Sequence, residues 1–164
     1  MPVPMPRLEL VRADHAEALL AFERENREYF GAVIPDRGDQ YFAEFGARHA
    51  QLLEWQAAGT DYFHVLVTDA GEIVGRVNLV EVKDASAELG YRIAQAAAGQ
   101  GLATAAVAEI RKLAVTTYGL TSLRAKVTLD NPASHRVLER NGFVATGERT
   151  LNGKPAVTYL CELG

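Results

Sequence analysis

The sequence has few residues that could bind metals or form covalent cross-links. Its single cysteine, Cys161, excludes an internal disulfide and a zinc cluster held by thiolates. One cysteine is typical of a reducing compartment, so we expect a cytoplasmic location, and we interpret Cys161 as a small core residue. We expect no metal, because the histidines lack the spacing of metal ligands; they are His15, His49, His64 and His135.

Long apolar runs and an excess of basic charge are missing as well. The apolar runs have the length of strands, below the ~18 to 20 residues of a membrane-spanning helix. Residues 1–6 lack the pattern of a signal peptide, and we expect them to form a loose leader. No basic stripe of the kind that binds nucleic acid is present, so we expect neither a membrane nor a nucleic acid as partner. The formal net charge of −4 suits a cationic substrate such as an amine, although it equally serves solubility.

The length of 164 residues, without repeats or linkers, predicts one compact domain over 1–164. Apolar periodicity predicts about seven strands and about four helices. In chain order these are a strand at 8–12, helices at 14–29 and 39–59, strands at 62–68, 72–82 and 87–93, a helix at 101–118, a strand at 123–129, a helix at 131–142, and strands at 143–151 and 157–163. Asp14 and Glu17 predict a capping box at the start of the first helix.

These elements predict a single mixed sheet of the α/β class. The short turns, such as the Asn152-Gly153 pair between the last two strands, favour antiparallel neighbours, and the first half of the sheet should be antiparallel. The helix between 87–93 and 123–129 should make a right-handed crossover, which predicts that those two strands form a parallel central pair.

A segment rich in small residues, Ala98–Thr104, lies between a predicted strand and a predicted helix. Gly99 and Gly101 allow close approach to the backbone, and the free N–H groups of the following helix favour an anion such as phosphate. A dinucleotide fingerprint would need glycine at Thr104, and a P-loop would need lysine at Leu102. A phosphate site and an ordinary turn before a helix are the two interpretations that the residues allow.

Two motifs together resemble the GNAT superfamily of N-acetyltransferases. Gly99–Thr104 resembles its motif A, and Asn131–Ser134, followed by Gly142-Phe143 eleven residues after the asparagine, resembles its motif B. The resemblance covers nearly the whole chain and implies acetyl-CoA as cosubstrate. The chain departs from the pattern at two positions: Ala98 replaces Gln or Arg, and Leu138 replaces a tyrosine that many members use as general acid.

The same resemblance implies how acetyl-CoA is held. Its pyrophosphate would lie on the motif A loop and the helix N-terminus, and its pantetheine along the backbone of the strand at 87–93. The implied contacts are Tyr91, Arg92, Ile93, Gly99, Gln100, Gly101, Ala103, Thr104, Asn131 and Ser134. Asn131 is in any case a suitable N-cap for the last helix.

The implied reaction is direct attack of a neutral amine on the thioester. An α-amine with a pKa near ~8 is partly neutral at pH 7, so a modest base or water suffices. Ser134 is the candidate donor to the CoA sulfur, and Glu88 is the candidate base. Each also has a structural interpretation, since a serine in a first helical turn can bond the backbone and strand carboxylates are usually solvated.

Finer features resemble the branch that contains ribosomal-protein N-terminal acetyltransferases of the RimJ and RimL type. Asn26-Arg27, with Phe30 and Pro35 after it, resembles the first-helix signature of that branch, and Glu88–Tyr91 resembles its central strand. The resemblance implies a protein N-terminal α-amine as acceptor, for example that of a ribosomal protein. Asn26 and Arg27 could contact this acceptor or tie the first helices together.

The acceptor stays open at this stage. Tyr159 is a further candidate for its site, whereas Lys154–Val157 departs from the pattern of the branch at the same edge. A small-molecule amine acetyltransferase is one alternative. A regulatory protein that binds acyl-CoA without turnover is another, favoured by Ala98 and Leu138. Exposed sheet edges would also permit a homodimer.

Overall fold

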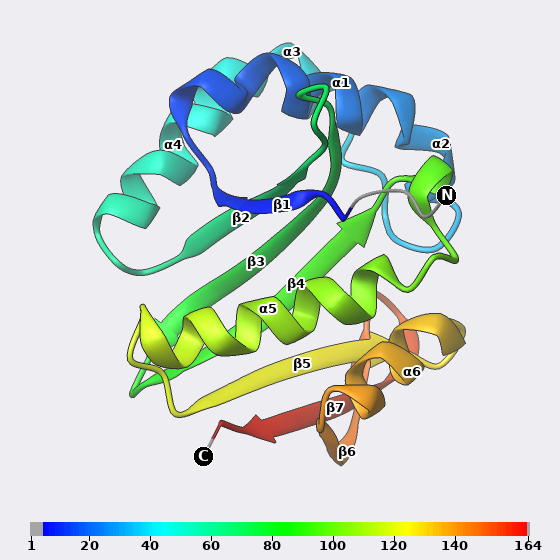
Figure 1. Cartoon of the computed structure of the whole chain (residues 1–164). Helices are drawn as coiled ribbons and strands as arrows, with labels where there is room; N and C mark the ends of the chain where they lie inside the picture. The colour runs from blue at the N-terminus through cyan, green and yellow to red at the C-terminus, as the bar shows by residue number, and fades with distance from the viewer. Residues whose placement is uncertain (1–4, 164) are drawn as a thin grey trace.

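The computed structural model describes residues 5–163, which form a seven-stranded sheet with helices on both faces (Figure 1). The expected loose leader falls largely on residues 1–4, outside the described residues. The strands are β1 (Arg7–Leu10), β2 (Tyr62–Val67), β3 (Ile73–Lys83), β4 (Ser86–Ile93), β5 (Ser122–Thr128), β6 (Val144–Leu151) and β7 (Lys154–Glu162). The helices are α1 (Ala16–Glu25), α2 (Arg27–Gly31), α3 (Asp39–Ala43), α4 (Phe45–Ala57), α5 (Leu102–Thr116) and α6 (Pro132–Arg140), with 3₁₀ turns η1 (Ala13–His15) and η2 (Gln95–Ala97). None of the helices within 5–163 has both the length and the hydropathy needed to cross a membrane.

The strand order is β1-β2-β3-β4-β5-β7-β6, and β4 and β5 are its parallel pair. The other neighbours pair antiparallel, which confirms the predicted mixed sheet. The turn between β6 and β7 has positive φ at both Asn152 and Gly153, +53° and +77°, as a two-residue hairpin turn requires.

The sheet separates two apolar cores. Alternate side chains of a strand point to opposite faces, and β2 shows this directly. Leu66 packs with α5 and α6, whereas Val65 and Val67 pack with residues of α1 to α4. In Figure 1, α5 crosses in front of β4, and α6 lies beside it in front of β7. Helices α5 and α6 therefore cover one face of the sheet, and α1 to α4 cover the other.

The structure corrects the prediction for the N-terminal helices, because each of the two expected helices is divided. The first breaks at Asn26 (φ −107°, ψ 10°), whose side chain donates to the carbonyl of Phe22 and accepts from the N–H of Gln95. A side chain that bonds nearby backbone competes with helical hydrogen bonding. The second breaks at Glu44 (φ −104°, ψ 19°). The described residues thus hold six α-helices rather than about four.

The predicted capping box at Asp14 and Glu17 is wrong. Asp14 lies inside the turn η1, and its carboxylate accepts a hydrogen bond from Arg12 Nε at 3.0 Å. His15 takes the structural role instead: its Nδ1 accepts from the backbone N–H of Arg12 at 2.9 Å, and α1 begins one residue later. Buried histidine packing overrides the local capping preference.

The feature that positions the site is an early end to the β4–β5 ladder. Only Ser86, Ala87 and Glu88 pair with β5, at Ser122–Arg124. From Leu89 to Ile93, β4 pairs with β3 on its other side, while β5 stays paired with β7 as far as Thr128. The two central strands therefore diverge beyond Glu88 and leave an opening in the middle of the sheet.

A buried histidine outside the cavities predicts how stability depends on pH. His64 in β2 is 1% exposed, and its Nδ1 lies 3.1 Å from the carbonyl oxygen of Val77. A carbonyl only accepts, so Nδ1 donates to it and Nε2 accepts from the Tyr118 hydroxyl at 2.6 Å. Burial lowers the pKa of His64 to about 4. The imidazole is therefore neutral in the folded protein.

Because the folded-state pKa of His64 lies below the unfolded value, the unfolded chain binds the proton first as the pH falls. Its contribution to stability is complete above pH ~6.5 and declines toward pH ~4. We expect the melting temperature of the wild type to fall between pH 6.5 and 5, and His64→Leu to have a shallower slope over this range. Parallel slopes for the two proteins, measured by thermal unfolding, would contradict this.

Candidate functional site

Two cavities of ≈ 360 Å³ each meet at the opening between β4 and β5. The β5 cavity, as we call it, is lined by the loop after α2, the facing parts of β4 and β5, and the hairpin at 151–154. The α5 cavity is lined by the end of β4, the segment 97–104 and α6. They share a wall made of Val33, Ile34, Tyr91, Asn131 and Ser134. A molecule in one cavity can therefore meet a molecule in the other at this wall.

The start of α5 is open toward the α5 cavity. Gly101 is the N-cap of α5 with φ +75°, and Gly99 has φ +77°, so both adopt a left-handed conformation that favours glycine. A Cβ built on either residue would meet no atom within 4 Å. The space beside these glycines at the start of a 15-residue helix is thus open, and the free N–H groups of a helix's first turn favour an anion. Ala103 and Thr104 line the same cavity, whereas Gln100 does not.

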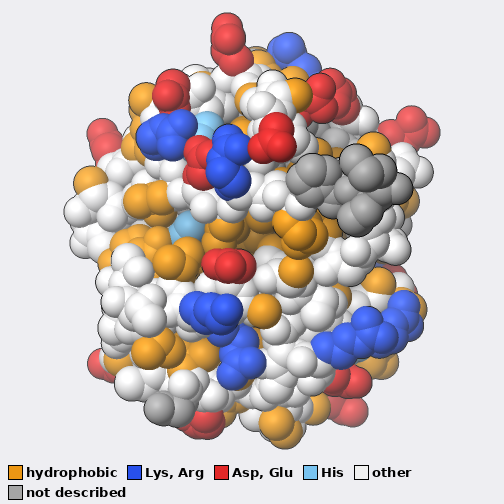
Figure 2. Space-filling model, viewed as in Figure 1, with side chains coloured by type: hydrophobic (Ala, Val, Ile, Leu, Met, Phe, Trp, Pro, Cys, Tyr) orange, Lys and Arg blue, Asp and Glu red, His pale blue; other side chains and the backbone are white. Residues whose placement is uncertain are grey.

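Basic side chains surround this cavity. Arg92, Arg136 and Arg140 line it, and no Asp or Glu within residues 5–163 does. Arg136 and Arg140 stand one turn apart on α6, and Figure 2 shows basic side chains over that helix. Sequence reasoning missed both arginines, although their i, i+4 spacing on a helix that follows motif B was a readable signal. Positive charge and free N–H groups together suit a polyanion.

Two hydroxyl groups meet at the shared wall. Tyr91 Oη of β4 donates to Ser134 Oγ of α6 at 3.0 Å. Burial raises the pKa of the Tyr91 phenol, which keeps its proton. Because Ser134 accepts this bond, its own hydroxyl proton is free to point toward a ligand. The sequence predicted only a backbone role for Tyr91, so its hydroxyl is an addition from the structure.

The wall is fixed by the start of α6. Asn131 caps this helix, and its Oδ1 accepts from the N–H of Ser134 at 3.4 Å, so the capping interpretation of Asn131 holds alongside its place in the wall. His135 Nε2 lies 2.9 Å from the carbonyl oxygen of Thr128, and its Nδ1 lies 2.6 Å from the Tyr159 hydroxyl. Since the carbonyl can only accept, Nε2 carries the proton and Nδ1 accepts from Tyr159. His135 thus holds α6 against β5 and β7 directly beside Ser134.

Glu88 lies at the point where the strands diverge. Its carboxylate pairs with Lys126 Nζ at 3.4 Å, and it lines neither cavity. The partner, Lys126, does line the β5 cavity. The structure therefore brings Ser134 and Tyr91 together at the shared wall. It places Glu88 outside both cavities, in an ion pair with Lys126.

Three predicted acceptor contacts also lie away from the cavities. Asn26 is buried and bonded to Phe22 and Gln95, which ties α1 to the segment after β4. Arg27 donates to Asp36 and Asp39 at 2.8 to 3.2 Å. These contacts match the interpretation that the pair ties the first helices together.

Tyr159 is buried with its hydroxyl on His135 and lines neither cavity. The buried Cys161, 1% exposed, has the predicted place in the core.

The β5 cavity is the natural place for a second ligand. Gly31–Pro35 and the hairpin residues Leu151, Asn152 and Lys154 line it, which are the two regions where the sequence leaves the acceptor open. Its ionic lining residues within 5–163 are Lys126 and Lys154. Each lysine has an acidic partner outside the lining, Glu88 at 3.4 Å and Asp130 at 2.9 Å. The cavity thus offers no carboxylate from the described residues to a cationic ligand.

Comparison with known proteins agrees with this geometry. Residues 7–144 match the family described as acetyltransferase (GNAT) domain. The chain is 29% identical over 146 residues to a probable N-acetyltransferase, YjcK, of Bacillus subtilis, covering 85% of this chain and 80% of that protein.

Solved structures share the whole fold. Ribosomal-protein-S5-alanine acetyltransferase of Vibrio fischeri superposes with a TM-score of 0.90 at 20% identity, covering 99% of this chain and 95% of that one. RimJ of Mycobacterium smegmatis, solved with a CoA disulfide, gives 0.85 at 23% identity, covering 98% and 86%. A variant of spermidine N-acetyltransferase from Vibrio cholerae gives 0.77 at 18% identity, covering 96% and 95%. At these identities the matches establish the fold, and they include proteins named for different acceptors.

The open helix start predicts the effect of filling it. Gly101→Val adds a side chain toward the α5 cavity, and we expect acetyl-CoA affinity to fall by about tenfold or more as anion contacts are lost. The matched control is Gly119→Val just beyond the other end of α5, where φ is +66° and a Cβ also meets nothing within 4 Å. Both variants carry similar backbone strain. Calorimetric titration that finds equal affinities in the two variants would remove the anion site from the start of α5.

Proposed function

Because the chain belongs to the acetyltransferase (GNAT) family, and is thus an acyltransferase, we propose that it transfers an acetyl group from acetyl-CoA to the N-terminal α-amine of a protein or peptide, a ribosomal protein being the first candidate. The observation that carries this proposal is the meeting of two cavities at the hydroxyl pair of Tyr91 and Ser134. One cavity suits a polyanionic donor, and the other is free for an acceptor.

The residues of the α5 cavity fit acetyl-CoA. The first-turn N–H groups of α5, opened by Gly99 and Gly101, would hold the pyrophosphate. Arg136 and Arg140 would face the remaining phosphate charge. The edge of β4 from Tyr91 to Ile93, free of β5, would pair with pantetheine. Ala98 also lines the cavity, so its departure from the motif removes one side-chain contact and leaves this backbone surface in place.

Ser134 is the group that we propose to act at the sulfur. When bound, acetyl-CoA supplies an acyl thioester with a carbonyl carbon open to attack and a thiolate as leaving group. As the amine nitrogen bonds to that carbon and the C–S bond breaks, the Ser134 hydroxyl donates a hydrogen bond to the departing sulfur. Tyr91 orients this hydroxyl by donating to Ser134 Oγ. The tyrosine that many members place at position 138 is replaced here by a buried leucine, 1% exposed. The hydroxyl groups near the thioester in our proposal are therefore those of Tyr91 and Ser134.

The surroundings of the β5 cavity favour a neutral amine without a dedicated base. Lys126 and Lys154 line it, and the carboxylates that pair with them, Glu88 and Asp130, lie outside the lining. Positive neighbours disfavour an ammonium ion and lower the pKa of a bound amine. We therefore propose that water in this cavity takes the amine proton, in place of Glu88, whose carboxylate is held by Lys126.

The same charges favour an α-amine over a polyamine. A polyamine carries several ammonium groups at neutral pH, and those that do not react need acidic partners once they leave water. The described residues supply none in the lining of the β5 cavity. A peptide N-terminus brings only one amine, and its backbone carbonyl groups can accept from the lysines. A small amino-carboxylate is the alternative that this lining would also accept.

Removal of the proposed donor should separate chemistry from binding. We expect Ser134→Ala to lower kcat on the order of 10²-fold with little change in acetyl-CoA affinity, because the hydroxyl acts on the leaving group. Ser134→Thr keeps the hydroxyl and should retain more activity. Steady-state kinetics and calorimetry check both effects. An alanine variant with the kcat of the wild type would remove Ser134 from the mechanism.

An acceptor panel tests the substrate class. With saturating acetyl-CoA, we expect peptides with a free α-amine to exceed spermidine in kcat/KM by at least about tenfold, because like charges in an interface cost several kcal/mol. Lys154→Gln removes one positive charge from an exposed hairpin. We expect this variant to show a smaller ratio of kcat/KM between the peptides and spermidine. Spermidine as the better acceptor would refute the α-amine proposal. Binding of acetyl-CoA without turnover of any amine would favour a regulatory protein instead.

A further inference from the structure

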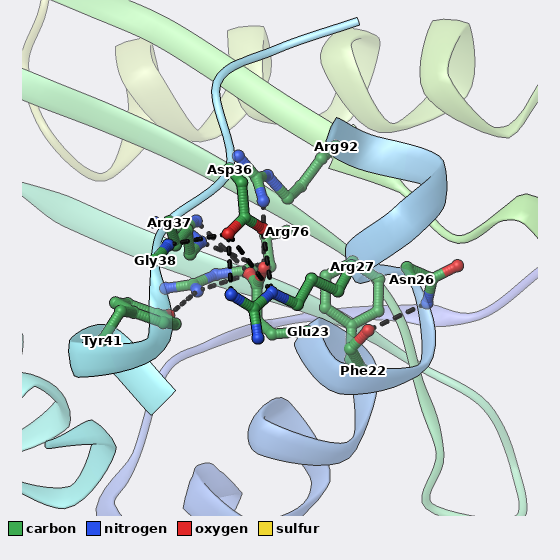
Figure 3. Close-up of polar contacts among 10 residues, drawn as sticks. All are labelled: Phe22, Glu23, Asn26, Arg27, Asp36, Arg37, Gly38, Tyr41, Arg76 and Arg92. Atoms are coloured by element: carbon green, nitrogen blue, oxygen red, sulfur yellow. Dashed lines mark hydrogen bonds and ion pairs between the residues drawn. The ribbon is translucent and has the colours of Figure 1, made fainter. Parts of the chain in front are cut away.

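A single buried carboxylate joins three separate parts of the chain. Glu23 of α1 is 1% exposed and accepts hydrogen bonds from three arginines (Figure 3). Arg37, in the loop between α2 and α3, donates through Nε at 3.0 Å and Nη2 at 3.3 Å. Arg76 of β3 and Arg92 of β4 each donate through Nη1 at 2.9 Å. One side chain of the first helix thus connects a loop and two strands far from it in sequence.

The ions of this cluster depend on one another. Burial by itself would raise the pKa of the Glu23 carboxyl, but the charges of Arg37, Arg76 and Arg92 outweigh it and hold this pKa below its usual value. Burial lowers the pKa of Arg92 to about 10, so that Arg92 is still charged at neutral pH. The cluster holds one negative and three positive groups, and Glu23 is the anion that they share.

The loop that Glu23 reaches is the roof of the β5 cavity. We call residues 32–38, between α2 and α3, the roof loop. Four of its residues, Ala32 to Pro35, line the β5 cavity, and Val33 and Ile34 also belong to the wall shared with the α5 cavity. A second ion pair holds the same end of this loop, since Asp36, next to Arg37, accepts from Arg27 Nη2 at 2.8 Å. The lining residues 32–35, which precede both anchors, form only turns and a bend.

The cluster also includes Arg92 of β4, the strand that we propose to pair with pantetheine. Arg92 follows Tyr91, whose hydroxyl bonds Ser134, and it lies in the lining of the α5 cavity. Its guanidinium stands over the ring of Phe30, 4.7 Å from the centroid, at the end of α2. The roof loop and the strand that carries Tyr91 are therefore held at one distance from each other by bonds to the same carboxylate.

We propose that Glu23 is a positioning residue that sets the roof loop over the acceptor relative to β4, so that acceptor binding depends on the contact between Arg37 and Glu23. The proposal rests on the proposed function in taking the β5 cavity as the acceptor site. A purely architectural cluster would change stability alone. A positioning cluster changes the acceptor KM while acetyl-CoA binding is preserved. All four lining residues of the roof loop line the β5 cavity, whereas two of them also line the α5 cavity.

The test removes the ion pair that ties the roof loop to Glu23, while the pair of Arg27 with Asp36 and the buried part of the cluster remain. In Arg37→Ala, the removed side chain is 29% exposed, and Glu23 keeps its bonds to Arg76 and Arg92. We expect the acceptor KM to rise about tenfold or more, because small misplacements of binding groups have effects of this size. The Kd for acetyl-CoA should stay within about twofold of the wild type. Arg37→Lys, which keeps a charge but loses the two-nitrogen contact, should recover part of the KM.

The matched control is Arg48→Ala. The guanidinium of Arg48 also stands over the ring of Tyr41, 5.5 Å from the centroid against 4.6 Å for Arg37. The ion pair of Arg48 is with Glu44, four residues earlier in the chain, and does not involve Glu23. We expect Arg48→Ala to keep the wild-type KM. A second measurement does not require turnover: hydrogen exchange of the Val33 and Ile34 amides, which donate to the Phe30 carbonyl, should be faster in Arg37→Ala than in the control.

The outcomes are distinct. An Arg37→Ala variant with wild-type KM and wild-type exchange in 32–38 would overturn the role of Glu23 in positioning. Equal effects in Arg37→Ala and Arg48→Ala would overturn it as well, since the roof loop would not be the cause. A wild type that acetylates no amine would instead refute the proposed function, and the exchange measurement would still decide whether Arg37 holds the loop. Glu23→Gln, which leaves three cations without their shared anion, should lose stability even if the loop has no part in binding.

Discussion

The structure depends on the early divergence of β4 from β5. A parallel pair inside a sheet normally continues its ladder, because unpaired backbone groups are costly away from water. Here the ladder stops after Glu88, and the second half of β4 has an edge that no described strand covers. This edge, with the open start of α5 beside it, gives one ligand a backbone surface. A second cavity lies on the other side of the opening, and the lining shared by the two cavities includes the bonded pair Tyr91 and Ser134.

The two strands that border the opening, β4 and β5, lack a ladder between them beyond Glu88. Polar contacts hold each of these strands in place instead. On the β4 arm, Glu23 accepts from Arg92, and Asn26 accepts from the N–H of Gln95. On the β5 arm, His135 donates to the carbonyl of Thr128. All of these side chains are buried or half-buried, where a satisfied hydrogen bond is worth most and an unsatisfied one costs most. Residues that could be taken for acceptor contacts, such as Asn26, therefore act one step away from the ligands, by holding the walls of the cavities.

The charge of the side chains that line the cavities is opposite in sign to the net charge of the chain. The chain has a net charge of −4, but the ionic residues that line both cavities within 5–163 are all basic. The α5 cavity collects arginines from β4 and α6, which suits a polyanion. The β5 cavity collects lysines from β5 and the last hairpin, each paired with a carboxylate outside the lining. The acids that balance the total lie on the outer surface or, like Glu23, are buried behind the walls.

The sequence by itself determined the chain order of the seven strands, the parallel pair, the glycine-rich start of α5 and the place of Ser134 in the first turn of α6. These follow from short-range patterns: apolar periodicity, glycine at positive φ, and an asparagine cap. Only the tertiary structure decided which polar side chains line a cavity. It placed Tyr91 on Ser134, and it turned Glu88 toward Lys126 and Tyr159 toward His135, because those partners come from distant segments. Local sequence carries no record of such pairings, since the same strand residue can face a cavity or an ion pair with the same alternation pattern.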